Sequence, residues 1–180
     1  MNDISGVAGV SKRTLYDSFE NKDELLLQML AMIDIRLGDY YKKLLEQSIS
    51  ALEILLLFNK KIKDETVWFC PAFYDDIIRY PRAYDYLIRY KKKSLNSLIV
   101  LLKQGTKEGV FMAEVDFDII AHLIRERIEM SPLPPQKFGE YSHEEVGKLL
   151  FLIFVRGICT EKGRKILECY TTKEHFRKNN

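Results

Sequence analysis

The chain has 180 residues, of which 47% are hydrophobic and 30% charged, a composition typical of a folded globular protein and unlike that of a disordered one. This length suits one large domain, or a small module joined to a larger one. Lysine and arginine total 28 against 26 aspartates and glutamates, and a net charge of only +2 points to no particular partner.

Three further features narrow the class of protein. The longest apolar runs, such as residues 149–155, are far shorter than the roughly 18 residues that a membrane span needs, so we expect no span. The amino-terminal residues lack the basic and apolar pattern of a secretory signal. Cys70, Cys159 and Cys169 lack the two-residue spacing of a zinc or redox motif, which predicts reduced thiols in a cytoplasmic protein.

The first elements predicted are two short helices joined by a tight turn. Asn2 and Asp3 can cap a helix that runs to Ala8, and Gly9 can take the left-handed conformation that ends it. Ser11 is placed to cap the second helix. A small shared core is expected from Ile4, Val7, Ala8, Val10, Leu15 and Phe19. This is the geometry of a helix-turn-helix, whose second helix presents its first residues to the DNA major groove.

Long helices follow. Apolar residues recur at steps of three and four from residue 22 to 47, the period of one helical face, and Asn21 with Glu24 supplies an N-cap and its reciprocal partner. Further helices are predicted at residues 50–69, 72–79, 82–107, 116–129 and 143–161, with a short one at 163–170 and a frayed tail at 173–180. Residues 131–142, with three prolines and a glycine, predict a loop.

The predicted fold is therefore all-α. Period-two alternation is nowhere sustained, which argues against strands. Residues 1–47 would form the helix-turn-helix module and its connecting helix, and residues 48–180 a larger helical domain.

The stretch GVSKRTLYDSFENKDELL resembles the helix-turn-helix and following helix of TetR-family (tetracycline-repressor-like) transcriptional regulators. The elements Ala8-Gly9-Val10-Ser11, Thr14-Leu15-Tyr16, Phe19 and Lys22 stand in the order and at the spacing of that family. The resemblance implies a ligand-responsive regulator that binds a double-stranded, palindromic operator as a homodimer and is released by a small apolar or aromatic effector. Repression is the default in the family, and the sequence leaves activation open.

The recognition helix supplies the candidate DNA contacts. A hydroxyl and free amides at a helix start can bind phosphate, and cationic side chains there can reach guanine edges or phosphate. The resemblance adds phosphate contacts at the tyrosine of the motif and at the first residue of the next helix. The candidate DNA-binding residues are Ser11, Lys12, Arg13, Thr14, Tyr16 and Lys22. Each also has a plain structural reading, as a cap, a core residue or a solvated charge.

Two departures from the family pattern keep a second reading open. Family members carry a whole helix ahead of this motif, so either the sequence is truncated or the first helix is absent. Residues 1–24 also hold three basic and five acidic side chains, a net charge of −2, which is unfavourable for DNA. The alternative is a dimeric small-molecule-binding helical protein with a vestigial or truncated DNA-binding module.

An unusual density of aromatic residues marks the middle of the chain. The resemblance implies that this region lines the effector pocket, and aromatic walls with a few hydroxyls suit an apolar or aromatic molecule. The candidate pocket residues are Trp68, Phe69, Phe73, Tyr74, Tyr84, Tyr86 and Tyr90. The alternative is that these side chains simply fill a core.

Apolar stripes on the helices at 116–129 and 143–161 exceed what one domain needs. The resemblance implies that two such helices pair with their twofold copies in a four-helix dimer interface, which would set two recognition helices about 34 Å apart. The candidate interface residues are Ile120, Ile124, Ile128, Leu150, Ile153, Phe154 and Gly157. The alternative is a pair of internal core helices.

An enzyme is the remaining rival. His122 and Glu126 form one helical pair that could bind metal or move a proton, although a surface contact is the ordinary role for such a pair. Neither a phosphate-binding glycine loop nor a nucleophile motif is recognisable. We therefore expect no catalytic residue, no metal and no cofactor.

Overall fold

The computed structural model describes residues 6, 9–66, 71–130 and 139–178, without the side chains of residues 12, 15, 16, 66, 71, 143 and 172–178. Within these ranges the chain is all-α, as predicted, with one isolated β-bridge between Phe111 and Cys159. The helices are α2 (Lys12–Ser18), α3 (Lys22–Leu45), α4 (Ala51–Thr66), α5 (Pro71–Ile77), α6 (Pro81–Lys107), α7 (Phe117–Met130), α8 (His143–Ile158) and α9 (Glu161–Lys178).

The long helix α3 begins where the sequence predicts, because Asn21 caps it. The Asn21 side chain accepts a 3.0 Å hydrogen bond from the backbone amide of Glu24. The sequence also predicted that the Glu24 carboxylate would accept a reciprocal hydrogen bond from the Asn21 backbone amide, and this prediction was wrong. That carboxylate instead accepts from the Gln28 side chain at 2.7 Å and pairs with Arg82 of α6 at 2.8 Å. Glu24 therefore joins two helices rather than completing a cap.

The carboxyl-terminal prediction needs correction. Helix α8 ends at Ile158 rather than at residue 161, and α9 runs for 18 residues where a short helix and a frayed tail were expected. The final turns of α9 are polar and carry no apolar period, so hydrophobic periodicity could not predict a helix there.

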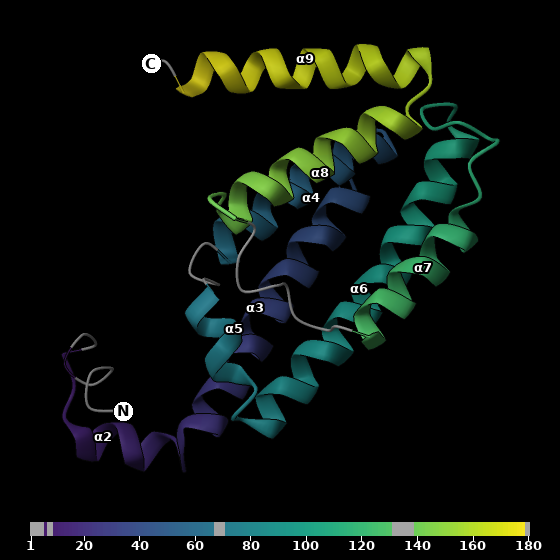
Figure 1. Ribbon diagram of the computed structural model, residues 1–180. Coiled ribbons are helices and arrows are strands. Elements are labelled where there is room, and N and C mark those ends of the chain that lie inside the picture. The colour runs from purple at the N-terminus through teal and green to yellow at the C-terminus, as the bar shows by residue number, and fades with distance from the viewer. Residues whose placement is uncertain (1–5, 7–8, 67–70, 131–138, 179–180) are drawn as a thin grey trace.

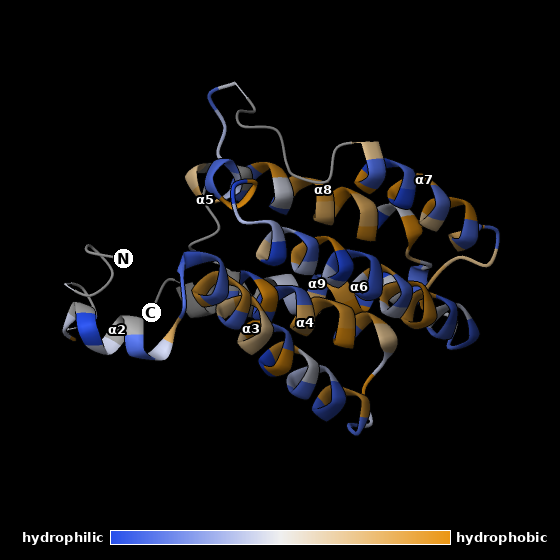
Figure 2. Ribbon diagram, turned by 90° about the horizontal axis from the view of Figure 1, so that it is seen from below, coloured by the Kyte–Doolittle hydropathy of each residue, from blue (hydrophilic) through white to orange (hydrophobic). Residues whose placement is uncertain are grey.

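Helix α6 is the central element. It packs against α3 and α4 on one side and against α7 on the other (Figure 1). Hydrophobic and hydrophilic residues occupy different sides of α3 and α7, as expected for helices with one buried face (Figure 2). The fully buried side chains with the largest volumes are Phe111, Leu37, Leu44, Leu52, Ile54, Ile77, Leu102, Val110, Val155 and Cys159.

A smaller cluster lies near the amino-terminal end of α3. Leu30 of α3, Ile77 of α5, and Ala83 and Leu87 of α6 are all buried there. This cluster joins the base of α3 to the α5–α6 corner. Helix α2 projects from that end of the molecule, opposite α9 (Figure 1).

The corner after α6 is closed by tight packing around two glycines. A β-carbon on Gly105 would lie 2.2 Å from Cδ2 of Phe111, and one on Gly163 would lie 2.2 Å from the carbonyl oxygen of Val110. The segment after α6 is thereby held against the α8–α9 corner, where the amide of Thr160 donates to the Val110 carbonyl at 3.1 Å.

None of the helices in the described ranges has the length and apolar character that crossing a bilayer requires.

Candidate DNA-binding and ligand sites

The turn that leads into α2 has the predicted conformation. Gly9 has a φ of 65°, the left-handed region, and its amide donates to the Gly6 carbonyl at 3.3 Å. Ser11 caps α2, since its Oγ accepts from the backbone amide of Thr14 at 3.0 Å. Val10, expected in the small core, is 40% exposed. The predicted core residues Ile4, Val7 and Ala8, and the Leu15 side chain, lie outside the described set.

The first turn of α2 presents polar groups to solvent. Ser11, Arg13 and Thr14 are all exposed. The Arg13 side chain is 92% exposed and only loosely paired with Asp17, at 4.0 Å. The side chains of Lys12 and Tyr16 are not described. The described part of this surface thus offers a guanidinium and two hydroxyls at a helix start, groups that suit phosphates and base edges.

Lys22, the sixth candidate for DNA contact, lies in a different environment. Its ammonium donates to Oδ2 of Asp76 in α5 at 2.5 Å and lies 4.9 Å from the centre of the Tyr80 ring. The hydrogen bond to Asp76, followed by one to Tyr80, raises the pKa of Lys22, and Lys22 lowers the pKa of Asp76. Lys22 therefore faces the body of the molecule in this structure.

The next two residues complete what we call the clamp, formed by Lys22, Asp23 and Glu24 on the α5–α6 corner. The Asp23 carboxylate accepts from the backbone amides of Arg82 at 3.2 Å and Ala83 at 2.9 Å. These amides start α6 and need acceptors, because Tyr80 at the N-cap makes no side-chain cap bond. The helix that carries α2 is thus fastened to the start of α6. The sequence did not predict these contacts, because Arg82 and Ala83 lie 59 and 60 residues after Asp23.

A cavity of about 490 Å³ lies further along the same two helices. Its walls come from α3 and α6 and its floor from α4, and its apolar part includes Leu37, Tyr41, Leu55, Phe58, Leu98 and Leu101. On the α6 wall three hydroxyl-bearing residues, Tyr90, Ser94 and Ser97, follow one helical face. A cavity of this size and lining suits a small, largely apolar molecule.

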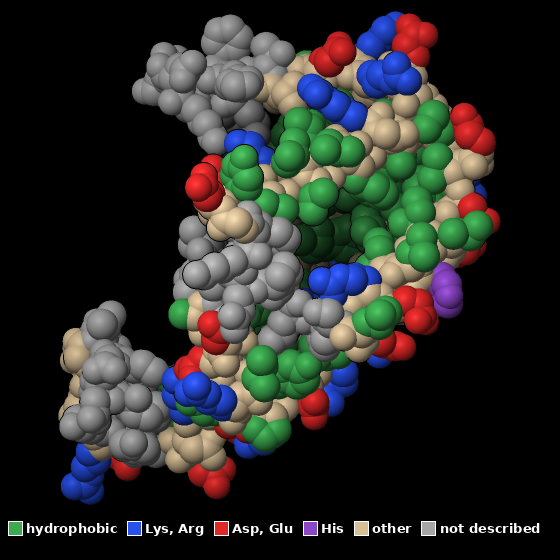
Figure 3. All heavy atoms as spheres, viewed as in Figure 1, with side chains coloured by type: hydrophobic (Ala, Val, Ile, Leu, Met, Phe, Trp, Pro, Cys, Tyr) green, Lys and Arg blue, Asp and Glu red, His purple; other side chains and the backbone are tan. Residues whose placement is uncertain are grey.

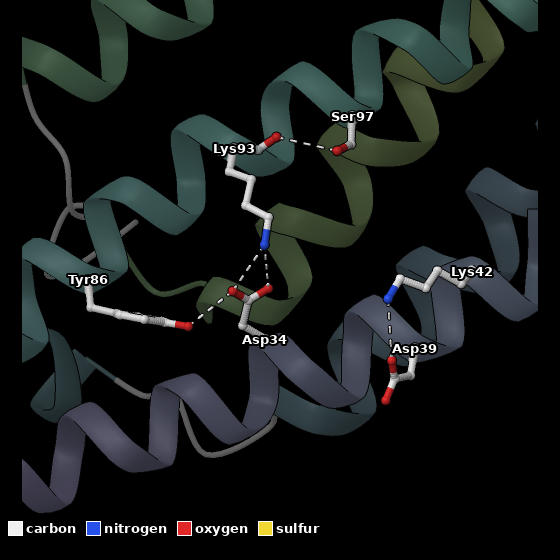
Figure 4. A network of polar contacts seen from close by, with 6 residues as sticks. All are labelled: Asp34, Asp39, Lys42, Tyr86, Lys93 and Ser97. Carbon is white, nitrogen blue, oxygen red and sulfur yellow. Dashed lines mark hydrogen bonds and ion pairs between the residues drawn. The ribbon is translucent and has the colours of Figure 1, made fainter.

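A polar network lies along the wall of this cavity (Figure 4). Asp34 of α3 accepts from the Tyr86 hydroxyl at 3.0 Å and from the Lys93 ammonium at 3.3 Å, and both donors belong to α6. Burial, followed by the bond to Asp34, raises the pKa of Tyr86 to about 12, so that the hydroxyl stays a donor at neutral pH. At the mouth, Lys42 pairs with Asp39 at 3.8 Å.

Only some of the predicted aromatic pocket residues lie at the cavity between α3 and α6. Tyr90 lines the cavity, and Tyr86 lines a small adjoining one. Phe73 and Tyr74 pack instead against the cluster at the base of α3, in edge contact 5.4 Å apart. Tyr84 packs against the same cluster and also borders a groove beside α7. Trp68 and Phe69 lie outside the described residues.

The α3 wall of the cavity was not among the pocket residues predicted from the sequence. Gly38, in the middle of a helix with strong apolar periodicity, is the signal that could have indicated it, since glycine destabilises a helix interior without another role.

The predicted dimer residues fall into two groups. Ile120, Ile124 and Ile128 of α7 are half-buried against the core of their own chain, and their place in a dimer interface stays a prediction. The exposed apolar residues of α7 are Ile119, Leu123 and Met130. On α8, Leu150 and Ile153 are exposed, Phe154 is half-buried, and a β-carbon on Gly157 would meet nothing within 4 Å.

The exposed apolar side chains of α7 and α8 border one face. In Figure 3 hydrophobic side chains gather around a hollow between these helices. On α7, His122 and Glu126 of the rival enzyme reading are both exposed. In the part of the chain that is described, three or more His, Cys, Asp or Glu side chains nowhere gather as a metal site would require.

Comparisons with known proteins agree with this arrangement. Residues 1–29 match the family model described as bacterial regulatory proteins, tetR family. The chain is 25% identical over 170 residues to the HTH-type transcriptional repressor KstR2 of Mycolicibacterium smegmatis, covering 92% of this chain and 83% of that protein. KstR2 of Mycobacterium tuberculosis is also 25% identical, over 167 residues, covering 89% and 83%.

The fold is likewise similar to a solved structure, that of the ketosteroid transcriptional regulator KstR2 of Mycobacterium tuberculosis. The TM-score is 0.55 at 22% identity, over 88% of this chain and 84% of the other. The matched family segment holds the Gly9 turn, the Ser11 cap and α2, which are the residues that carry the resemblance. Residues 1–29 thus carry the amino-terminal segment of the tetR family of bacterial regulatory proteins, and the chain as a whole is similar to the KstR2 repressors of that kind.

Proposed function

We propose that the chain is a ligand-responsive transcriptional repressor that binds a palindromic operator as a homodimer and releases it when a small, largely apolar molecule enters the cavity. The observation that carries this proposal is that α3 and α6 meet twice. They form the two walls of the cavity, and they are joined again at the clamp, from which α3 leads directly to α2.

The DNA contacts proposed are those of the first turn of α2. Ser11, Arg13 and Thr14 are exposed there, and Lys12 belongs to the same turn. Tyr16 and Lys22 are proposed as phosphate contacts on the family resemblance. Residues 1–47 would thus serve as the DNA-binding module, working in the cytoplasm where the operator lies, and residues 48–180 as the ligand-binding and dimerisation domain.

The ligand class follows from the lining of the cavity. Asp34 and Asp39 are matched by Lys93 and Lys42, so the charges around the cavity cancel. The hydroxyls of the α6 wall can bond to a few oxygen atoms of an otherwise apolar molecule. The solved relative is named as a ketosteroid regulator, and a rigid apolar molecule with a few oxygens is the class that we propose here.

Helices α3 and α6 would couple ligand binding in the cavity to DNA binding by α2. A ligand that separates α3 from α6 at the cavity would turn α3 about the clamp and thereby change the position of α2. Such a ligand must bind one arrangement of α3 better than the other, since only differential affinity shifts an equilibrium.

The homodimer proposal is supported by the uncovered apolar faces of α7 and α8. Leu123 and Leu150 are 62% and 59% exposed, and a monomeric soluble protein rarely leaves such a contiguous patch open. A twofold pair of these helices would also supply the two recognition helices that a palindrome needs.

A gel shift with full-length protein and the DNA upstream of its own gene tests the function at a stated salt concentration. We expect a shift that Arg13→Ala and Thr14→Ala abolish or weaken, because both remove groups of the first turn of α2. Arg125→Ala is the matched control, since that arginine lies on α7 and bonds to Asn96. Failure of the wild-type protein to bind any DNA would favour the alternative, a ligand-binding protein with a vestigial DNA module.

A further inference from the structure

The ammonium of Lys22 already has an anionic partner within its own chain. It bonds to Asp76 of α5 at 2.5 Å and lies over the Tyr80 ring. The two side chains of this ion pair are 33% and 38% exposed, so water reaches the pair from outside. An ion pair in such a position is weak, because solvent screens it, and an incoming anion can compete for the ammonium.

Neither partner depends on the other to keep its place. Asp76 has a second cation, Arg79, whose Nη1 lies 3.6 Å from the other carboxylate oxygen. On the side of α3, Asp23 and Glu24 hold the first turn to α6 through bonds of their own. Lys22 can therefore leave Asp76 without opening the clamp.

Lys22 is also the residue of the clamp best placed to reach DNA. It is the first residue of α3, four positions after the end of α2, and belongs to the junction between the recognition helix and the rest of the chain. A carboxylate and a phosphate bind an ammonium by the same charge-assisted hydrogen bonds.

We propose that Asp76 is an internal competitor of operator phosphate, holding the Lys22 ammonium in the free protein and giving it up to the DNA backbone in the complex. This inference rests on the proposed function. It makes Asp76 a positioning residue that lowers affinity for DNA of every sequence, since a phosphate contact carries no base information. Because Asp76 lies on α5, the position of α5 would also affect DNA affinity, independently of the angle of α2.

The test is Asp76→Asn, measured by fluorescence anisotropy with a labelled duplex of arbitrary sequence over a series of salt concentrations. We expect binding about two- to fivefold tighter near 0.1 M salt. The slope of log affinity against log salt should steepen by up to about 0.9, the value for one additional phosphate contact on B-DNA. A purely structural role of Asp76 would leave this slope unchanged.

Two controls isolate the competition. Asp75→Asn removes the same charge one position earlier on α5, where the side chain is exposed, and should have a smaller effect. In a Lys22→Met background, Asp76→Asn should change neither affinity nor slope, because the competed group is gone. Asp76→Ser repeats the test with a smaller side chain, and thermal unfolding verifies that each variant is folded.

The outcomes are distinct. Equal effects of Asp75→Asn and Asp76→Asn, or an effect of Asp76→Asn that persists without Lys22, would overturn the competition while leaving the repressor proposal standing. Unchanged affinity in both folded Asp76 variants would do the same. A wild-type protein that binds no DNA overturns both.

Discussion

The carboxylate of Asp23, in the first turn of α3, accepts a 2.9 Å hydrogen bond from the backbone amide of Ala83, in the first turn of α6. Ala83 is fully buried, and the residue at the N-cap of α6 supplies no side-chain acceptor, so one helix caps another across a gap of 60 residues. The capping bond therefore also connects the proposed DNA-binding and ligand-binding parts.

Asp23→Ala should lower the free energy of unfolding by about 1 kcal/mol or more, the usual loss for an N-cap replaced by alanine. Urea denaturation followed by circular dichroism measures it. Asp17→Ala is the matched control, since Asp17 is exposed and only loosely paired with Arg13. Equal stability of the two variants would show that the bonds to Arg82 and Ala83 contribute nothing.

Gly105→Ala should destabilise the protein by about 1–3 kcal/mol, because overpacking a filled core displaces its neighbours. The new β-carbon would lie 2.2 Å from the Phe111 ring, and Phe111 is only 1% exposed. Gly147→Ala is the control, since its β-carbon meets nothing within 4 Å and alanine favours the helix. Equal thermal unfolding temperatures of Gly105→Ala and Gly147→Ala would contradict the close packing of Gly105 against Phe111.

The sequence was sufficient for the features that depend on neighbours along the chain. The turn at Gly9 and the cap at Ser11 each depend on a contact between residues three apart. The apolar period predicted the end of α3 to within two residues. Long-range partners carry no such signal, which is why the contacts of Lys22 with Asp76 and of Asp23 with Ala83 could not be predicted.

The buried face of α7 could not be chosen from sequence either. Ile119 and Leu123 alternate with Ile120 and Ile124, so apolar residues cover two adjoining faces of the helix. Only packing against α6 decides that the second pair turns inward.

Leu150→Lys should convert a dimer to a monomer, because it places a charge in the apolar face that the proposed partner covers. Light scattering after size-exclusion chromatography reports the mass. Val100→Lys provides the control, since Val100 is 67% exposed on α6 and lies outside the proposed interface. A wild-type protein that is already monomeric, or a Leu150 variant that remains dimeric, contradicts the assignment of this face.

Lys91 should make the stability of the protein depend on pH in the alkaline range. Burial, with a smaller contribution from Arg127, lowers the pKa of Lys91 to about 8, against 10.5 in the unfolded chain. Between these values the unfolded state binds more protons than the folded state, so this group raises the free energy of unfolding as pH increases. Below pH 8 both states are protonated and the cost of burying the charge is present in full.

The measurement compares wild-type protein with Lys91→Met in urea denaturation from pH 7 to pH 10.5. The difference in unfolding free energy should shift in favour of the wild type as pH rises through this window, while all other groups cancel. A difference that stays constant would show that Lys91 is not desolvated in the folded protein.

Gly38→Leu should fill the cavity without disturbing the fold. Gly38 lines the cavity on α3, and a β-carbon there meets nothing within 4 Å. Leucine is also the better helix former by roughly 0.8–1 kcal/mol, so unfolding should become no easier. The variant should keep its DNA binding and lose the fluorescence enhancement of 1-N-phenylnaphthylamine, an uncharged apolar probe. Lys165→Leu adds a leucine on α9, where the side chain is 74% exposed and outside the cavity, and should keep both. A Gly38 variant that still binds the probe would show that the probe enters elsewhere.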